Sequence, residues 1–251
     1  MIFDLAVIGG VGFALEGLTD EIETSYGRVP IIRSRMKGIR VAFISRHGDV
    51  HLPPHRVDYR AIISAAKNTG ATAVISINTV GSMAGHPAGC IFLPSDFVEF
   101  TKSRANTFFE DRAVHVDLTR PYCPLLRAAL IDASRALGQA IAEGVYVCAE
   151  GPHLESPAQI KMMRQFGDVV GMTGYPEVVL AREAGLCYAS LCIVTNPAAG
   201  MNSGEDLSIS DIADLMKSRQ ETVRQIIQAA AQLIHEDRAC SCRNSLDAAM
   251  L

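Results

Sequence analysis

Short apolar runs alternate with amphipathic stretches along most of the chain. Runs rich in Val, Ile and Ala are typical of strands that are buried on both faces, and apolar residues three and four positions apart are typical of the helices that cover them. The pattern therefore predicts an α/β fold built on a largely parallel sheet. The predicted strands are Leu5–Ile8, Arg40–Ser45, Ala73–Ile77, Gly144–Ala149, Asp168–Met172 and Leu186–Thr195, and a short apolar run, Ile91–Pro94, precedes an acidic turn at Asp96.

Helical periodicity marks the stretches between several of these strands. Two of the predicted helices open with a proline in the first turn, where its missing N–H has no partner to lose. No repeat or linker interrupts the alternation, so we predict one domain over residues 1–236 and a polar tail, loose or separately tethered, over residues 237–251. The predicted helices are Tyr59–Asn68, Pro124–Leu137, Pro176–Ala184 and Ser210–Ile234.

Polar residues gather where the predicted strands stop. In open α/β sheets the ligand crevice lies outside the carboxyl ends of the strands. We therefore expect these side chains to meet in one site. They are Arg46 and His47, Asn78 and Thr79, Glu150 to Glu155, Met172 and Thr173, and Asn196.

One half of this site has the chemistry of an anion pocket. The glycine-rich turn from Gly9 through Gly10 to Gly12 can present backbone N–H groups, and Arg46 carries a permanent charge. Thr79 and Thr173 add hydroxyl donors. Taken singly, the turn also fits a dinucleotide loop or a plain turn, and the arginine fits a surface ion pair. Together these residues favour an oxyanion site.

Charge and hydropathy limit the class of partner. The chain has 251 residues, 23 of them basic and 27 acidic, with a net charge of -4. No long basic block occurs, so we expect a small-molecule substrate and no nucleic acid. The first residues include Asp4 and no basic stretch, and no apolar run approaches the ~20 residues of a membrane span. We expect no membrane partner and a cytoplasmic location.

The cysteines do not show the spacing of a metal site. The seven cysteines are scattered, with no CxxC pair, and only Cys240 and Cys242 lie close in sequence. Reduced, buried thiols are one interpretation. The other is structural disulfides, in which Cys187 and Cys192 pair with Cys123 and the tail.

The histidines do not indicate a metal site either. His47, His51 and His55 are spaced by four, but Pro53 and Pro54 argue against a helix that would align them. We expect no metal.

Several motifs resemble the purine nucleoside phosphorylase and methylthioadenosine phosphorylase family, in family order from Ile8 to about Ile234. The resemblance implies a single-domain α/β fold with a twisted mixed central sheet flanked by helices, assembled as a homotrimer or a dimer of trimers. It also implies inorganic phosphate as co-substrate and no cofactor. The motifs are Arg46-His47-Gly48, Asn78-Thr79-Val80-Gly81-Ser82, Arg120-Pro121-Tyr122-Cys123-Pro124, Glu150-Gly151-Pro152 with Glu155 downstream, and the run Gly171-Met172-Thr173-Gly174-Tyr175-Pro176-Glu177 continuing to Gly185.

The resemblance also implies roles for single residues. Arg46, His47, Thr79 and Thr173 match the phosphate contacts, with Gly10 in the turn beside them. Met172 matches the residue under the sugar ring. His115 is similar to a histidine that reaches the sugar site of a neighbouring subunit, although an interface histidine with no such role would look the same.

The chain departs from the family in its first glycine turn. The family usually has a Thr or Ser hydroxyl there for phosphate, and this chain has Val11. A lost hydrogen bond to a charged group costs about 1.5–3 kcal/mol. We expect weaker phosphate binding rather than none.

The base end of the predicted site favours a 6-oxopurine. Asn196 follows Thr195 where adenine-specific relatives carry an aspartate, and an amide can donate to O6 and accept from N7–H. Glu155 can accept from N1–H. We expect Asn196, Glu155 and His47 to be catalytic, in an SN1-like phosphorolysis. Alternatively, Asn196 is a turn former before Pro197, and Glu155 is a helix N-terminal acid.

The sugar end favours a 5'-methylthio group. In the stretch that should face the 5' position, Ile209, Ile212 and Ala213 form an apolar wall with no histidine. The same residues also suit the core face of an amphipathic helix. We predict phosphorolysis of S-methyl-5'-thioinosine, with inosine and guanosine also accepted. The alternatives are a methylthioadenosine phosphorylase, a nucleoside hydrolase and a non-catalytic nucleoside-binding subunit.

Overall fold

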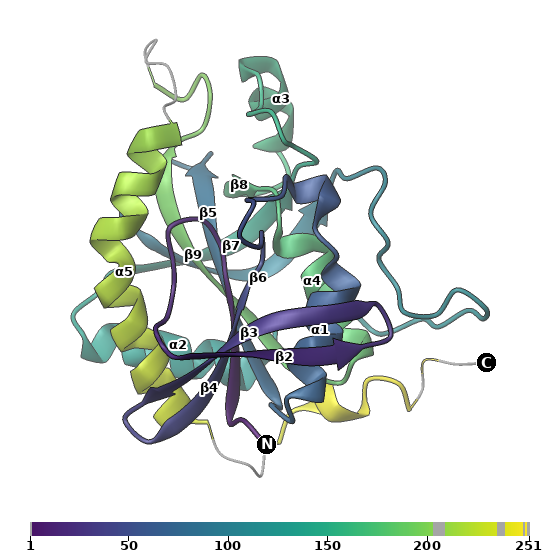
Figure 1. Cartoon of the computed structure of the whole chain (residues 1–251). Coiled ribbons are helices and arrows are strands. Elements are labelled where there is room, and N and C mark those ends of the chain that lie inside the picture. The colour runs from purple at the N-terminus through teal and green to yellow at the C-terminus, as the bar shows by residue number, and fades with distance from the viewer. Residues whose placement is uncertain (1, 203–208, 235–238, 248, 250–251) are drawn as a thin grey trace.

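One mixed sheet forms the centre of the protein, and the apolar runs of the sequence supply its strands (Figure 1). The computed structural model describes residues 2–202, 209–234, 239–247 and 249. The strands are β1 (Leu5–Gly9), β2 (Leu18–Thr24), β3 (Gly27–Met36), β4 (Ile39–Ser45), β5 (Ala73–Ser82), β6 (Ile91–Glu99), β7 (Ile141–Cys148), β8 (Val169–Gly171) and β9 (Cys187–Pro197). The helices are α1 (Tyr59–Asn68), α2 (Pro124–Ala136), α3 (Pro157–Met163), α4 (Gly174–Glu183) and α5 (Ile209–Gln232), with short 3-10 helices η1 (Pro54–Arg56) and η2 (Ser241–Asn244).

Strand β5 is the hub of the sheet. The strands follow the order β2-β3-β4-β1-β5-β8-β7-β6-β9, and β5 also pairs with β9. It runs parallel to β1 and β9 and antiparallel to β8. Because β6 pairs with both β7 and β9, and β7 pairs with β8, the strands from β5 round to β9 close into a ring. The predicted mixed central sheet flanked by helices is confirmed.

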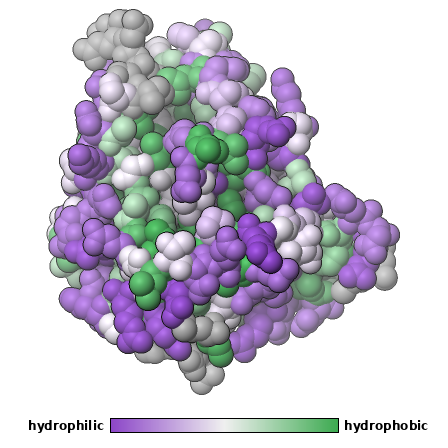
Figure 2. All heavy atoms as spheres, in the orientation of Figure 1, coloured by the Kyte–Doolittle hydropathy of each residue, from purple (hydrophilic) through white to green (hydrophobic). Residues whose placement is uncertain are grey.

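Two helical layers bury the two faces of the sheet. In Figure 1, α2 and α5 lie on one side of the strands, and α1 and α4 lie on the other. The first layer packs on β1, β5 and β9 through residues such as Leu130 and Ile226. The second layer packs on β1 and β4 through residues such as Ile63 and Val178. On the face drawn in Figure 2 most of the surface is hydrophilic, and hydrophobic residues show mainly in its middle.

Two predicted strands are longer than their apolar runs. β5 continues past Ile77 to Ser82, because its polar residues Ser76 and Asn78 are buried with hydrogen-bond partners. Asp96 is not in a turn, since β6 continues through it to Glu99 after a bulge beyond Pro94. Both strands therefore extend into the region of the predicted site.

The sequence pattern missed the β2–β3 hairpin and α3. Strand β2 is exposed or half-exposed along its whole length and carries Asp20, Glu21 and Glu23, so it has no apolar face to detect. Helix α3 has only seven residues and is identified by its capping box, in which Ser156 and Gln159 exchange hydrogen bonds.

The described part of the tail packs against the domain. Cys242 in η2 and Ala249 are buried, and the backbone N–H of His115 donates to the carbonyl oxygen of Ala249 (2.8 Å). The predicted boundary at residues 236 and 237 lies outside the described residues. Among the helices of the described chain, none is both long and apolar enough to cross a membrane.

Candidate active site

The carboxyl ends of parallel strands bring the predicted site residues to one edge of the sheet. Gly9 at the end of β1 is level with Ser45 at the end of β4, which places the glycine turn next to Arg46. Near the end of β5, Gly81 is level with Asn196 of β9. Strand β5 therefore lies between the predicted anion end and the predicted base end, as the convergence of strand ends predicts.

Arg46 is buried at the anion end, with 2% of its surface exposed. Its Nε donates to Glu177 (2.5 Å), its Nη2 donates to Ser76 Oγ (2.6 Å) and to Glu177 (3.3 Å), and its Nη1 donates to the carbonyl oxygen of Ile77 (3.0 Å). The carboxylate of Glu177 also accepts from Ser76 (2.6 Å) and from Tyr188 (2.8 Å). Arg46 is thus fixed in a hydrogen-bond network that joins the end of β4 to β5, α4 and β9.

This network changes the electrostatic role expected of Arg46. Burial opposes its charge, but the charge and hydrogen bonds of Glu177 outweigh burial and raise the pKa of Arg46. The guanidinium stays charged, and the buried carboxylate offsets that charge. Four of its five N–H groups already have acceptors, so at most one, on Nη1, is left for phosphate. Arg46 contributes a positioned donor more than a net charge.

The glycine turn passes directly over this guanidinium. A Cβ added to Gly10 would lie 2.8 Å from Arg46 Nη1 and 2.7 Å from the carbonyl oxygen of Ile77, so only glycine fits there. A Cβ added to Gly12 would lie 2.8 Å from Met216 Cβ of α5 and 3.6 Å from the carbonyl oxygen of Ala213. The turn is therefore held between β5 and the N-terminal half of α5.

His47 follows Arg46 and is also largely buried, with 8% exposed. Its Nδ1 lies 2.7 Å from the carbonyl oxygen of Leu52, and its ring stacks on His51 with centroids 5.0 Å apart. Burial lowers the pKa of His47, and the positive charge of Arg46 adds to that effect. The ring is therefore neutral at pH 7, with its proton on Nδ1 and a free lone pair on Nε2.

Thr173 and Asn78 form a second buried polar pair beside the anion end. The Thr173 hydroxyl donates to Asn78 Oδ1 (2.9 Å), and Asn78 Nδ2 donates to Ser190 Oγ (2.7 Å). Thr173 is the residue before α4, and its N–H and that of Gly174 donate to the Tyr146 hydroxyl (3.3 and 3.2 Å). Thr79 is half-buried one residue further along β5 than Asn78.

Arg104 ties together two loops of the site, a role that sequence reasoning missed. Its Nη1 donates to the carbonyl oxygens of Met172 (2.5 Å) and Tyr175 (2.9 Å), and its Nη2 donates to that of Glu150 (2.6 Å). Met172 in turn lies against Gly151, where an added Cβ would be 2.5 Å from its sulfur. The segment after β7 and the residue predicted to lie under the sugar are therefore positioned together.

The amide of Asn196 has a fixed orientation at the base end. Its Nδ2 donates to the carbonyl oxygen of Pro197 (2.8 Å), and its Oδ1 accepts from the Thr195 hydroxyl (2.8 Å). A carbonyl oxygen can only accept, so the nitrogen must face Pro197. One N–H and one oxygen lone pair are left, which is the donor and acceptor set that O6 and N7–H of a 6-oxopurine require.

Glu155 lies just before α3, and one of its carboxylate oxygens is buried without a hydrogen-bond partner. Burial raises the pKa of Glu155, against the lowering effect of a backbone N–H and of His153. A buried acceptor without a donor is costly in a folded protein and indicates a group that awaits a ligand.

Three residues predicted to contact the substrate lie outside the hydrogen-bond network of the candidate site. His115 is exposed on the segment between β6 and α2. Ala213 is half-buried in α5, near the glycine turn. Ile209 is the first residue of α5, and its side chain lies outside the described part of the structure.

Sequence reasoning also missed the role of Glu177, which it placed only in the first turn of a helix. The available signal was an acidic residue inside an otherwise apolar, buried run, since Glu177 is 0% exposed. Such a residue almost always has a cationic partner, and the partner lies 131 positions away in sequence.

The fold and this edge of the sheet define the class of protein. The chain belongs to the phosphorylase superfamily, whose family model matches residues 4–234. This family membership confirms the resemblance to nucleoside phosphorylases that the sequence motifs indicated.

Two relatives and one solved structure place the chain within that superfamily. The probable S-methyl-5'-thioinosine phosphorylase of Methanosarcina acetivorans is 47% identical over 251 residues, which cover 99% of this chain and 97% of the relative. The 6-oxopurine nucleoside phosphorylase of Pyrococcus furiosus is 41% identical over 261 residues and covers 98% of both chains. A solved methylthioadenosine phosphorylase sourced from an antarctic soil metagenomic library has a TM-score of 0.91 at 33% identity, covering 100% of this chain and 93% of that one.

Proposed function

We propose that this protein catalyses phosphorolysis of 6-oxopurine nucleosides, with S-methyl-5'-thioinosine as the preferred substrate. The products are hypoxanthine and 5-methylthioribose 1-phosphate. The observation that carries the proposal is that the two ends of the site, spaced along β5, differ in their chemistry. At Ile77 the strand meets the guanidinium and the glycine turn, and at Gly81 it meets the amide of Asn196. Four residues of strand span about 13 Å, which leaves room for phosphate, pentose and base in line.

The chemistry follows from these two ends. The bond between N9 and C1' breaks with its electrons going to the purine, and a phosphate oxygen bonds to the cationic C1'. The departing purine takes up a proton from solvent at N7, which balances the hydrogen that monohydrogen phosphate loses as its oxygen bonds to C1'. The N7–H then donates a hydrogen bond to the free lone pair of Asn196 Oδ1, while the free N–H of Asn196 donates to O6. Glu155 accepts from N1–H with its unpartnered oxygen. These groups stabilise charge that develops only as the bond breaks.

At the other end phosphate is held by hydrogen bonds more than by net charge. The donors are the N–H groups of the glycine turn, the remaining N–H of Arg46 and the hydroxyl of Thr79. The Thr173 hydroxyl joins them by turning its hydrogen from Asn78 to phosphate. The unprotonated Nε2 of His47 accepts the hydrogen of monohydrogen phosphate. The side chain of Val11 adds no donor, so we infer a high Michaelis constant for phosphate.

The substrate is inferred from both ends of the nucleoside. The carbonyl oxygen of Ala213 lies near Gly12, which places the first turns of α5 beside the glycine turn. The half-buried side chains of Ile212 and Ala213 are the apolar groups that we assign to the 5' substituent. The relatives named for S-methyl-5'-thioinosine and for 6-oxopurine nucleosides support the oxo base. The similarity to a solved methylthioadenosine phosphorylase supports the alternative, an adenine nucleoside.

Three further properties belong to this proposal. We infer a homotrimer, or a dimer of trimers, in which the exposed His115 of one subunit contacts the sugar bound by its neighbour. We infer a cytoplasmic enzyme of purine salvage. We also infer that phosphate is the only co-substrate and that no cofactor takes part.

The Asn196→Asp variant tests the base assignment. The specificity constant kcat/KM is measured for S-methyl-5'-thioinosine and S-methyl-5'-thioadenosine at saturating phosphate. We expect the wild-type protein to prefer the oxo base and the variant to shift the ratio toward adenine by about tenfold or more, because a carboxylate cannot donate to O6. Asn68→Asp, on the surface of α1, is the matched control and should leave the ratio unchanged. An unchanged ratio in Asn196→Asp would refute the assignment.

A further inference from the structure

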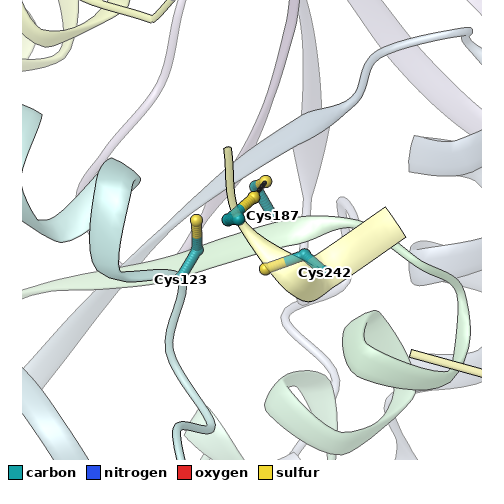
Figure 3. Close-up of side chains that lie close together, drawn as sticks. Cys123, Cys187 and Cys242 are labelled. Atoms are coloured by element: carbon teal, nitrogen blue, oxygen red, sulfur yellow. Dashed lines mark hydrogen bonds between the residues drawn. The ribbon is translucent and has the colours of Figure 1, made fainter. Parts of the chain in front are cut away.

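Four of the seven cysteines meet at the end of the sheet opposite the candidate active site. The sulfur atoms of Cys123, Cys187, Cys240 and Cys242 all lie within 4.8 Å of one another. Figure 3 shows that Cys123 comes from the segment before α2, Cys187 from β9 and Cys242 from η2. All four are free thiols, and three of them are buried. Cys187 and Cys240, which are 64 and 117 positions after Cys123 in the sequence, therefore lie beside it in the fold.

The backbone around the cluster is well supported. The N–H of Cys123 donates to the carbonyl oxygen of Tyr188 (2.8 Å), and the N–H of Cys187 donates to that of Thr72 (3.0 Å). The tail packs on the turn after α4: a Cβ added to Gly185 in that turn would lie 3.2 Å from the carbonyl oxygen of Arg243. The segment that carries Cys242 is therefore closely packed. The sulfurs are therefore presented by fixed elements rather than by loose ends.

The spacing of the sulfurs matches a metal better than a bond between them. A tetrahedral Zn²⁺ with Zn–S bonds of about 2.3 Å holds its ligands about 3.8 Å apart. The sulfurs of Cys187 and Cys240 are 3.3 Å apart, and the others lie within the 4.8 Å limit. A disulfide requires about 2.05 Å.

Arg182 supplies an independent observation about charge. It is 6% exposed, and its Nη1 donates to the sulfur of Cys242 (3.5 Å), while its other nitrogens donate to the carbonyl oxygen of Asp117 (3.1 Å) and to Ser241 (3.4 Å). Within the described chain it makes no salt bridge, although the exposed carboxylate of Asp117 interacts with it through space. A buried cation needs a nearby negative charge. Solvent screens the exposed Asp117, so a thiolate at Cys242 would provide a buried negative charge in contact with Arg182, and two disulfides would not.

We propose that Cys123, Cys187, Cys240 and Cys242 form a tetrathiolate site for a thiophilic divalent cation, Zn²⁺ first among them. Each thiol releases its proton on binding, and no oxidant or reductant takes part. Four thiolates around Zn²⁺ carry two net negative charges, which Arg182 partly balances. The half-buried Cys240 gives the ion access from solvent. The site goes beyond the proposed function, and the absence of paired CxxC spacing hid it from sequence analysis.

The position of the site makes it an anchor rather than part of the catalytic machinery. Cys187 begins β9 and Asn196 lies near its end, nine residues away, which is about 30 Å of strand. Bound metal would join η2 to α2 and β9 and so fix the end of the chain to the domain. Loss of metal should therefore lower stability and leave the base preference intact.

Metal content of the full chain tests the proposal. The protein is expressed without a polyhistidine tag in medium supplied with zinc, purified under reducing conditions and analysed by inductively coupled plasma and native mass spectrometry. We expect about one zinc per chain. Cys242→Ser and Cys123→Ser should lose it, and Cys90→Ser, a half-buried cysteine outside the cluster, should keep it. Cobalt(II) added to apoprotein should give the visible bands of a tetrahedral thiolate complex.

Each result decides the question. Zinc at background level in reduced wild-type protein, with no cobalt–thiolate spectrum, overturns the proposal. Equal metal content in wild type and Cys242→Ser also overturns it. In a second preparation made without reductant, a mass deficit of two hydrogens for each pair of cysteines, without metal, assigns the cluster to disulfides instead. These readouts do not depend on nucleoside turnover, so they are separate from any failure of the proposed function.

Discussion

At the scale of single residues, the candidate site is governed by which polar groups already have partners. Arg46 has most of its donors engaged, whereas Glu155 has an unpartnered oxygen and Asn196 keeps one donor and one acceptor. Motifs could point to all three residues, because two of them follow or end a buried strand and Glu155 lies in the loop between β7 and α3. Their bonding could not be predicted, since the partner of Arg46 is 131 residues away.

The ionisation of Glu155 should control which base is preferred. Burial raises the pKa of Glu155 above its ordinary value of 4.5. Above that pKa the carboxylate accepts from N1–H of a 6-oxopurine, and below it the protonated acid can donate to N1 of adenine. The kcat/KM ratio of S-methyl-5'-thioinosine to S-methyl-5'-thioadenosine should therefore fall as pH falls from about 8 to about 5.

Glu155→Gln is the control for this effect, because the amide keeps the shape and does not titrate. Effects of pH on phosphate and on His47 apply to both substrates and cancel in the ratio. The variant's ratio should be flat over the same pH range. A slope equal to that of the wild-type protein would show that another group sets the preference.

The missing hydroxyl in the glycine turn should be restorable. Val11→Thr is nearly isosteric and adds a donor beside Gly10, so the Michaelis constant for phosphate should fall by about tenfold. Val11→Ala removes bulk without adding a donor and should not lower it. Initial rates at saturating nucleoside measure both. A constant unchanged in Val11→Thr would mean that position 11 does not face phosphate.

At the scale of elements, the site exists because strands extend beyond their apolar cores. The hydrophobic pattern located β1, β4, β5 and β9 correctly, but it ended β5 at Ile77, and the last five residues of that strand carry Asn78 and Thr79. Those polar residues can lie in a strand only because Ser190 and Thr173 satisfy Asn78. Such compensation between distant elements is invisible in a local pattern.

The ion pair between Arg46 and Glu177 should hold α4 against β4. Glu177→Gln keeps the shape but leaves a buried guanidinium without its counter-charge, which should lower the free energy of unfolding by about 3–5 kcal/mol. Urea unfolding of the purified protein measures the change. Glu183→Gln is the matched control, since Glu183 is also buried in α4 and, among the described residues, accepts a backbone N–H from Phe108 and no side-chain donor. Equal losses of unfolding free energy in the two variants would show that the ion pair is not what stabilises this contact.

At the scale of the whole molecule, the proposed trimer makes each site depend on two chains. We expect His115→Ala and Asn196→Ala to be weakly active alone. Refolded together, they should regain activity, because a His115→Ala subunit receives an intact His115 from its Asn196→Ala neighbour. Activity is measured against the mixing ratio, with each variant refolded alone as the control. No recovery in mixtures shown to contain both chains would place His115 outside the neighbouring site.

The central claim is that phosphate itself cleaves the glycosidic bond. The most direct measurement is phosphorus NMR of wild-type protein with S-methyl-5'-thioinosine, together with hypoxanthine release at increasing phosphate concentration. We predict a sugar 1-phosphate resonance that grows in step with hypoxanthine, and no hypoxanthine without phosphate. Hypoxanthine released at the same rate in phosphate-free buffer, with no sugar phosphate, would contradict the account.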